Sequence, residues 1–158
     1  MKYLFILAGI VLASACTTFP QTLPPVPKAI NAPGSRALGP YSQAMRAGDY
    51  VFLSGVVAFD AKEGKFAPAK IGPQTRQVFA NLKTVLAAAG LSLDDVVKTT
   101  VYLKNPADFA RMNPIYAGYF KDHKPARTTV PGVDWGRPDV LIEIEAVAYA
   151  PGALAPQP

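Results

Sequence analysis

The 158-residue chain has only one cysteine, Cys16, and one histidine, His123. One residue of each kind cannot supply the set of nitrogen and sulfur ligands that a zinc site needs. The sequence also has no glycine-rich phosphate loop of the P-loop or dinucleotide kind, and no spacing that indicates a Ser/His/Asp triad. We therefore predict no metal site and no cofactor, and we expect His123 on the surface.

The chain also lacks a concentration of charge of one sign. Lys and Arg number 16 and Asp and Glu number 11, which gives a net charge of +5. The basic residues are dispersed, and no basic run is interleaved with aromatic residues, as a nucleic-acid-binding stripe would require. The charge pattern predicts a mildly basic solvated surface and no nucleic-acid partner.

The N-terminal segment has the parts of an export signal: a basic start, an apolar middle over residues 3–12, and Ala13, Ser14 and Ala15 directly before Cys16. The segment is too short to span a bilayer as a helix, which takes about 20 residues. Two processing outcomes are open. Cys16 becomes the lipidated first residue of a bacterial lipoprotein, or an ordinary signal peptidase cuts after Ala15 and leaves a soluble periplasmic protein. The lone cysteine at this junction favours the lipoprotein, on the periplasmic side of a membrane.

Composition divides the chain into consecutive parts. Residues 1–15 are the predicted signal peptide, and residues 16–36 are Pro-rich and almost uncharged, which is typical of an extended tether. Residues 37–150 hold the periodic apolar patterns of a folded domain. Residues 151–158 are again rich in Pro and Ala, and we predict a disordered tail there.

Apolar periodicity predicts most elements of the domain. A hairpin turns at Ala47-Gly48-Asp49 into a strand over 50–57, and another strand covers 96–103 with Val97, Thr99, Val101 and Leu103 on one face. Between them lie a polar loop over 60–73 and an amphipathic helix from Gln74 to Ala89, which Gly90 ends.

Two Asn-Pro pairs, Asn105-Pro106 and Asn113-Pro114, each suit a helix N-cap followed by proline at the first helical position. They predict a short turn over 106–112 and a second helix over 114–122, in preference to one helix with an interior proline. The order strand, strand, helix, strand, helix, strand, strand favours an α+β fold, with a mixed sheet and both helices on one face.

The charged residues of the last two strand-like runs are the candidate functional groups. Glu143 and Glu145 alternate with aliphatic residues and so share one strand face. Arg127 lies in the preceding run, which we expect to be the neighbouring strand. Two interpretations are open: a structural salt bridge, or a pocket in which Arg127 holds a substrate carboxylate and a glutamate positions water.

A series of short motifs covers nearly the whole predicted domain in one order. Together they resemble the RidA family, also called YjgF or L-PSP. The motifs are Gly39-Pro40-Tyr41-Ser42-Gln43, Leu53-Ser54-Gly55, Gln74-Thr75-Arg76-Gln77 with Asn81-Leu82-Lys83, Asp94-Asp95-Val96-Val97-Lys98-Thr99-Thr100-Val101, Asp108-Phe109 with Met112-Asn113 and Tyr116, Pro125-Ala126-Arg127, and Ile142-Glu143-Ile144-Glu145-Ala146.

The resemblance implies a chorismate-mutase-like fold assembled as a homotrimer, with clefts between subunits. It implies hydrolysis of reactive enamines and imines (2-imino acids) to 2-keto acids and ammonia, without a cofactor. By the same resemblance, Arg127 binds the substrate carboxylate and Glu143 orients or activates the attacking water. Tyr41 closes over the ligand, and Gly55 and Asn113 line the cleft.

Other positions implied by the resemblance are less regular. Thr129 takes the place where some members have cysteine, Val56 stands where many have glutamine, and Thr128 stands where many have serine. These departures leave an alternative open, in which the same cleft binds small carboxylates or 2-keto acids without turnover.

Overall fold

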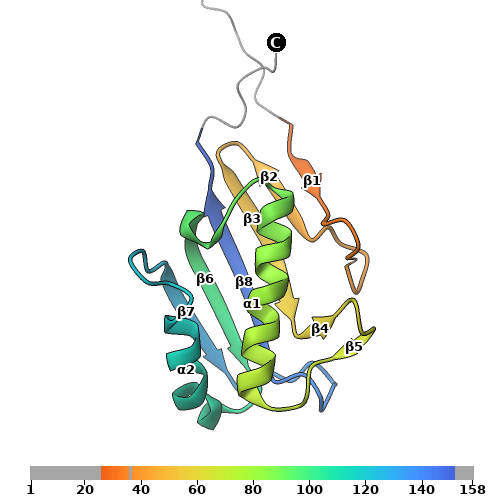
Figure 1. Cartoon of the computed structure of the whole chain (residues 1–158), viewed down its shortest axis with the longest axis vertical. Helices are drawn as coiled ribbons and strands as arrows, with labels where there is room; N and C mark the ends of the chain where they lie inside the picture. Colours follow the sequence, from red (N-terminus) through yellow and green to blue (C-terminus); the bar gives the residue numbers. More distant parts are fainter. Residues whose placement is uncertain (1–25, 36, 152–158) are drawn as a thin grey trace, which may run out of the picture.

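The computed structural model describes residues 26–35 and 37–151. Its centre is a six-stranded sheet with the order β1-β2-β3-β8-β6-β7 (Figure 1). The predicted signal peptide, the lipidation site Cys16 and the tail beyond residue 151 lie outside the described residues. The strands of the sheet are β1 (Lys28–Ile30), β2 (Ala44–Ala47), β3 (Tyr50–Val57), β6 (Val96–Leu103), β7 (Ala126–Pro131) and β8 (Ile142–Tyr149).

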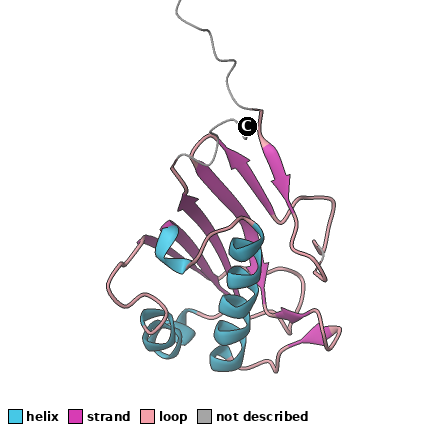
Figure 2. Ribbon diagram, turned by 45° about the horizontal axis from the view of Figure 1, so that its top comes forward, coloured by secondary structure: helices cyan, strands magenta, loops and turns pink. Residues whose placement is uncertain are grey.

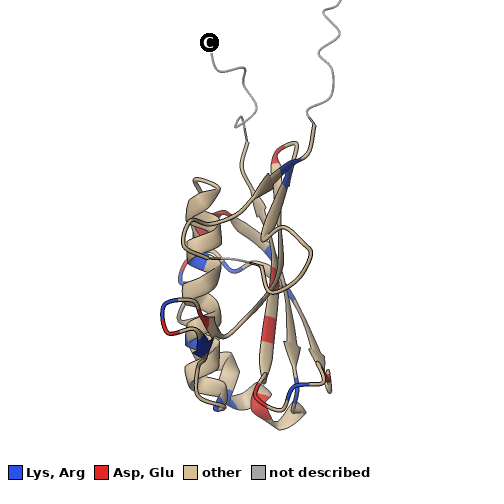
Figure 3. Cartoon of the chain, turned by 90° about the vertical axis from the view of Figure 1, so that its right-hand side faces the viewer, with Lys and Arg blue, Asp and Glu red and all other residues tan. Residues whose placement is uncertain are grey.

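The sheet is mixed, as predicted. β6 and β7 are parallel, and all its other neighbouring strands are antiparallel. Both α-helices, α1 (Ile71–Ala88) and α2 (Phe109–Ala117), lie against one face, and within the described residues the opposite face carries no helix (Figures 2 and 3). The smaller elements are the 3-10 helices η1 (Leu93–Asp95) and η2 (Pro106–Asp108) and a separate hairpin of β4 (Phe59–Asp60) and β5 (Lys65–Phe66).

Helix α1 confirms the amphipathic prediction. Its buried stripe includes Val78, Leu82 and Leu86, each at most 1% exposed. Burying one such side chain contributes about 1.5–3 kcal/mol. The helix begins at Ile71, earlier than predicted. Pro73 is tolerated in its first turn, because the N–H that proline lacks would have no helical partner there. The helix ends as predicted, since Gly90 has a φ of +74° and its N–H donates to the Ala87 carbonyl.

Helix α2 differs from the prediction. The second helix does not start at Pro114. It starts at Phe109, directly after η2, and Pro114 lies inside it. Asn105 does cap η2 through a 3.0 Å hydrogen bond from the Ala107 N–H, but Asn113 is an interior helical residue. The lost backbone bond is offset by packing, because Met112 and Tyr116 are buried against the core.

The sheet also begins earlier than the predicted domain start at Ala37. β1 pairs with β2 inside the range assigned to the tether, and Ala32 is buried. A strand of three residues has too short a pattern for its alternation to be recognised. The predicted polar loop over 60–73 likewise contains all of the β4–β5 hairpin except Phe59, together with the first residues of α1.

The faces of β8 and β6 are set by register. Ile142, Ile144 and Ala146 are buried under the helices, while Glu143 and Glu145 point to the uncovered face, as predicted. In β6, Thr99, Val101 and Leu103 are buried. Val97 was expected among them but is exposed, because the register with β8 shifts at this point.

No helix within residues 26–35 and 37–151 has the length and apolarity needed to cross a bilayer.

Candidate functional site

Arg127 projects from β7 toward the helix layer. Its Cζ lies 4.6 Å from the ring centroid of Tyr116 and 5.6 Å from that of Phe109, both on α2. Among the residues that the structure describes, Arg127 takes part in no ion pair. Its cationic group is therefore held by aromatic faces and keeps its N–H donors available.

The structural salt bridge considered for Arg127 does not form within the described chain. The prediction that its strand neighbours the glutamate strand is wrong, because β6 lies between β7 and β8. Thr99, which is opposite Arg127 in the β6–β7 register, faces the core, whereas Glu143 and Glu145 face the other side of the sheet. Glu145 instead accepts a 3.0 Å hydrogen bond from the Tyr102 hydroxyl.

Glu143 lies over Gly55 of the adjacent strand β3. A Cβ atom added at Gly55 would overlap the Glu143 carboxylate, so the absence of a side chain there makes room for it. Burial raises the pKa of Glu143, and the negative charge of Glu145 raises it further. A hydrogen bond from the Trp135 side chain acts in the opposite direction and lowers this pKa.

Asn113 and Thr129 belong to the surroundings of Arg127. Phe109, Asn113 and Tyr116 have the i, i+4, i+7 spacing of one helical face, so Asn113 lies between the two aromatic residues that contact Arg127. Thr129 follows Arg127 by two positions on β7 and shares its strand face. This shared face of α2 exists only because the helix continues through Pro114.

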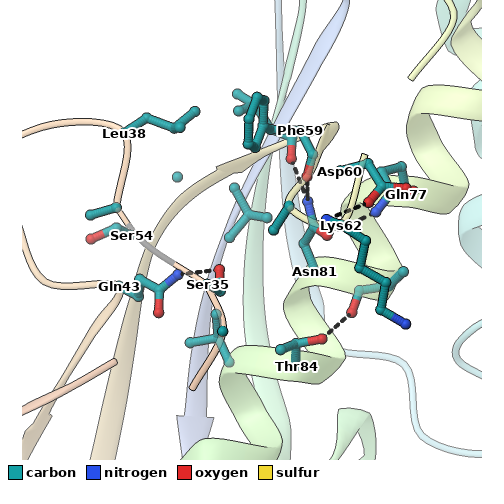
Figure 4. Close-up of a pocket in the computed structure, with 18 of the residues that line it drawn as sticks. Ser35, Leu38, Gln43, Ser54, Phe59, Asp60, Lys62, Gln77, Asn81 and Thr84 are labelled. Atoms are coloured by element: carbon teal, nitrogen blue, oxygen red, sulfur yellow. Dashed lines mark hydrogen bonds between the residues drawn. The ribbon is translucent and has the colours of Figure 1, made fainter. Parts of the chain in front are cut away.

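Tyr41 and Gly55 line a cavity of about 600 Å³ between α1, β3 and the loop that follows β1 (Figure 4). The loop is tied down by Gln43, whose side chain accepts from the Ala32 N–H at 2.7 Å and donates to Ser35 at 2.8 Å. Tyr41 is exposed at the rim, and its hydroxyl accepts from the Leu38 N–H at 3.3 Å.

The opposite wall of this cavity is α1. Gln77 and Asn81 project from the helix and share a 2.9 Å hydrogen bond. The Asn81 amide donates to the backbone carbonyls of Val57 and Phe59, which fixes the end of β3 to the helix. Polar side chains therefore hold the walls in place, and apolar groups such as Leu38 and Val56 line the space.

The structure divides the predicted site residues into two groups. Glu143 lies beside Gly55 on the uncovered face of the sheet. Gly55 also lines the cavity at Tyr41, whereas Glu143 is not among the residues that line it. Arg127 lies with Asn113 and Thr129 at the other edge of the sheet, near α2. A single described chain therefore holds two partial sites and does not bring them together.

Sequence reasoning missed several residues of these partial sites. The sequence placed Tyr116 only within a family motif, with no role in the site, and it gave Trp135 no role. Gln43 and Gln74 are buried amides, and Gln74 holds the loop before β8 by donating to the Asp139 carbonyl at 2.6 Å. The one signal that the sequence offered for Gln74 is its position, because this polar amide residue stands in line with the apolar stripe of the helix.

Across the described ranges 26–35 and 37–151, no group of three or more His, Cys, Asp or Glu side chains is placed to hold a metal ion.

The chain is an α+β protein. It has a mixed sheet with both helices on one face, and it holds separate Arg and Glu partial sites. The family model described as endoribonuclease L-PSP matches residues 29–150, and the chain belongs to this RidA/YjgF/L-PSP family. A RutC family protein of Pyrococcus horikoshii is 53% identical over 119 residues, which cover 75% of this chain and 92% of that protein.

Further relatives agree in sequence and in structure. The 2-iminobutanoate/2-iminopropanoate deaminase of Escherichia coli K12 is 41% identical over 121 residues, covering 75% of this chain and 91% of the relative. The crystal structure of the YjgF gene product of E. coli matches with a TM-score of 0.68 at 40% identity, and covers 77% of this chain and 98% of that one. RidA of an Antarctic Psychrobacter gives a TM-score of 0.71 at 34% identity, with 77% and 98% covered.

Proposed function

We propose that this protein hydrolyses 2-imino acids, and the enamines that tautomerise to them, to 2-keto acids and ammonia without a cofactor. One observation carries the proposal: Arg127 is a cation with aromatic contacts and no ion pair among the described residues, and Glu143 is a half-buried carboxylate with a raised pKa. The deaminase name of the E. coli relative supports the choice of substrate class.

Each group has a distinct role in this chemistry. Arg127 binds the planar substrate carboxylate with two parallel N–H donors, which positions the imine carbon. Glu143 accepts a proton from water while the water oxygen attacks that carbon and the C=N electron pair moves to nitrogen. Glu143 then returns the proton to the nitrogen, which gives a carbinolamine. A second transfer through Glu143 moves the proton of the new hydroxyl group to the amine nitrogen, so that ammonia leaves as the carbonyl forms. A raised pKa brings a carboxyl group closer to the working pH, which favours both transfers.

We further propose that the complete site lies between copies of the chain in a homotrimer. Arg127 of one copy, with Asn113 and Thr129, would meet Glu143 of the next copy, with Gly55 and Tyr41. The uncovered sheet face supports this assembly, because its large apolar side chains are between 37% and 48% exposed in the single chain. These side chains are Met45, Tyr50, Phe52 and Tyr149.

An imine panel tests the proposal. An amino-acid oxidase generates 2-imino acids in the presence of the full-length chain, and semicarbazide captures the imine that remains. We expect the wild type to suppress capture and release 2-keto acid, and Arg127→Ala and Glu143→Ala to do neither. Keto-acid release no faster than with Arg127→Ala would refute hydrolysis. Binding of 2-keto acids without turnover would select the alternative, a non-catalytic carboxylate-binding protein.

We also propose that the protein is exported and anchored to a bacterial membrane through acylated Cys16, with the folded domain on the periplasmic side. The support is the export-signal pattern in the sequence before Cys16. Acyl chains on this residue would provide the anchor, because they contribute about 0.8 kcal/mol of membrane binding per buried methylene. Labelled palmitate should be incorporated in the wild type and not in Cys16→Ala. Labelling that survives this substitution would exclude Cys16 as the acylated residue, and an unlabelled wild type would favour a soluble periplasmic protein.

A further inference from the structure

The two aromatic contacts of Arg127 differ in how firmly they are held. Phe109 begins α2 and is 41% exposed, whereas Tyr116 is 6% exposed. The Tyr116 hydroxyl shares a 2.7 Å hydrogen bond with Thr99 of β6, a residue only 1% exposed. The ring of Tyr116 is thus fixed at one end by the helix backbone and at the other by the sheet.

Thr99 is also the β6 residue opposite Arg127 in the register of β6 and β7. The ring of Tyr116 therefore lies between two groups in space. Its hydroxyl is bonded to Thr99, and its ring centroid lies 4.6 Å from the Arg127 Cζ. A hydroxyl bond to a buried strand determines where the ring lies, and the ring face determines where the cation is attracted.

We propose that Tyr116 is a positioning residue for Arg127 and that Thr99 in turn positions Tyr116. The inference rests on the ligand-binding role proposed for Arg127. A long arginine side chain loses much rotamer entropy when it binds a ligand, so a ring that restricts it beforehand strengthens binding.

The choice of an aromatic partner has a chemical consequence. A carboxylate would also hold the guanidinium, but it would occupy the N–H donors that a substrate carboxylate needs. An aromatic face attracts the cation without accepting those in-plane hydrogen bonds. Tyr116 can therefore orient Arg127 and leave its donors available to a ligand.

Binding of pyruvate to the full-length chain tests the proposal independently of turnover. We expect Tyr116→Leu to weaken binding by about 3- to 30-fold, the range for loss of a partly buried cation–π contact. Tyr116→Phe keeps the ring but removes its hydroxyl bond to Thr99, so it should weaken binding less than Tyr116→Leu does, by up to about 3-fold. With an imine substrate, KM should rise more than kcat falls, because the carboxylate is bound in both the ground state and the transition state.

A matched control separates positioning from packing. Tyr119 stacks on Phe79 with ring centroids 4.0 Å apart. Among the described residues, the aromatic rings that Arg127 contacts do not include that of Tyr119. Tyr119→Leu removes a comparable ring and should lower the Tm while leaving pyruvate binding unchanged. Phe109→Leu, at a site that is 41% exposed, provides a second test and should weaken binding by about 2- to 5-fold.

The NMR signal of the Arg127 Nε–H group reports its positioning directly. Its disappearance in Arg127→Lys assigns it, and it should broaden in Tyr116→Leu but not in Tyr119→Leu. If Tyr116→Leu and Phe109→Leu both bind pyruvate as the wild type does, with this signal unchanged, the proposal is wrong. A wild type that binds pyruvate but hydrolyses no imine would refute the proposed function and leave the binding test of Tyr116 valid.

Discussion

At the scale of single residues, the position of Glu143 depends on a missing side chain. Gly55→Ala would place a Cβ where the carboxylate lies. Because the displaced atoms are the end of a flexible side chain, we expect Glu143 to move at a cost of about 1–2 kcal/mol in unfolding free energy. Imine hydrolysis should fall by at least about tenfold, since misplacing a catalytic group by about 1 Å has effects of this order or larger. Activity and thermal unfolding of the same preparation measure the two effects.

Gly72→Ala is the matched control for this substitution. A Cβ at Gly72 would meet the Ile115 side chain at 3.5 Å, which is an ordinary contact. Replacing a helical glycine by alanine should stabilise the fold by up to about 1 kcal/mol and leave activity unchanged. Wild-type turnover in Gly55→Ala would show that the position of Glu143 over Gly55 is not needed for the reaction.

The environment of Glu143 also predicts opposite pH effects for two neighbours. Burial and the charge of Glu145 raise the pKa of Glu143, and the Trp135 side chain lowers it. As a base, Glu143 works when ionised, so kcat/KM falls as the pH drops through its pKa. Glu145→Gln should move this acid limb to lower pH, and Trp135→Phe should move it to higher pH. Shifts in the same direction would contradict the assignment of the limb to Glu143.

At the scale of elements, α2 tolerates a proline that local rules exclude. Pro114 removes the backbone bond to the Ala110 carbonyl. We expect Pro114→Ala to raise the unfolding free energy by about 1–2 kcal/mol, after allowing for the added freedom of the unfolded chain. Pro73→Ala, in the first turn of α1, restores no helical hydrogen bond and should change it by less than about 0.5 kcal/mol. Denaturant unfolding of both variants makes the comparison, and equal effects would mean that Pro114 imposes no cost.

The sequence-based predictions were right for elements whose signals lie within their own residues, and wrong where the structure depends on contacts distant in sequence. The strands at 50–57 and 96–103 and the helix ending at Gly90 were predicted because their periodicity and stop signal lie within their own residues. The helix through Pro114 was missed, since burial of Met112 and Tyr116 is a tertiary effect. The place of β6 between β7 and β8 was also missed, because strand order is not encoded in alternation.

The candidate site shows the same division. The resemblance identified Arg127 and Glu143 by position in the chain, but only the register showed that they face opposite sides of the sheet. The roles of Tyr116 and Trp135 depend on contacts with residues distant in sequence, and no local pattern marks them.

At the scale of the whole molecule, the proposed function together with the separation of Arg127 and Glu143 in one chain predicts an active site shared between copies. Arg127→Ala and Glu143→Ala should each be inactive alone. After unfolding and joint refolding in equal amounts, a site is complete where intact Arg127 meets intact Glu143, which for random cyclic assembly is about a quarter of the sites. We therefore expect roughly a quarter of wild-type activity in the mixture. Mass spectrometry of intact assemblies verifies that the two variants have mixed, and refolding each variant alone is the control. Mixed assemblies without activity would show that both groups must belong to one chain, whereas recovered activity would mean that neither copy is an enzyme without its neighbour.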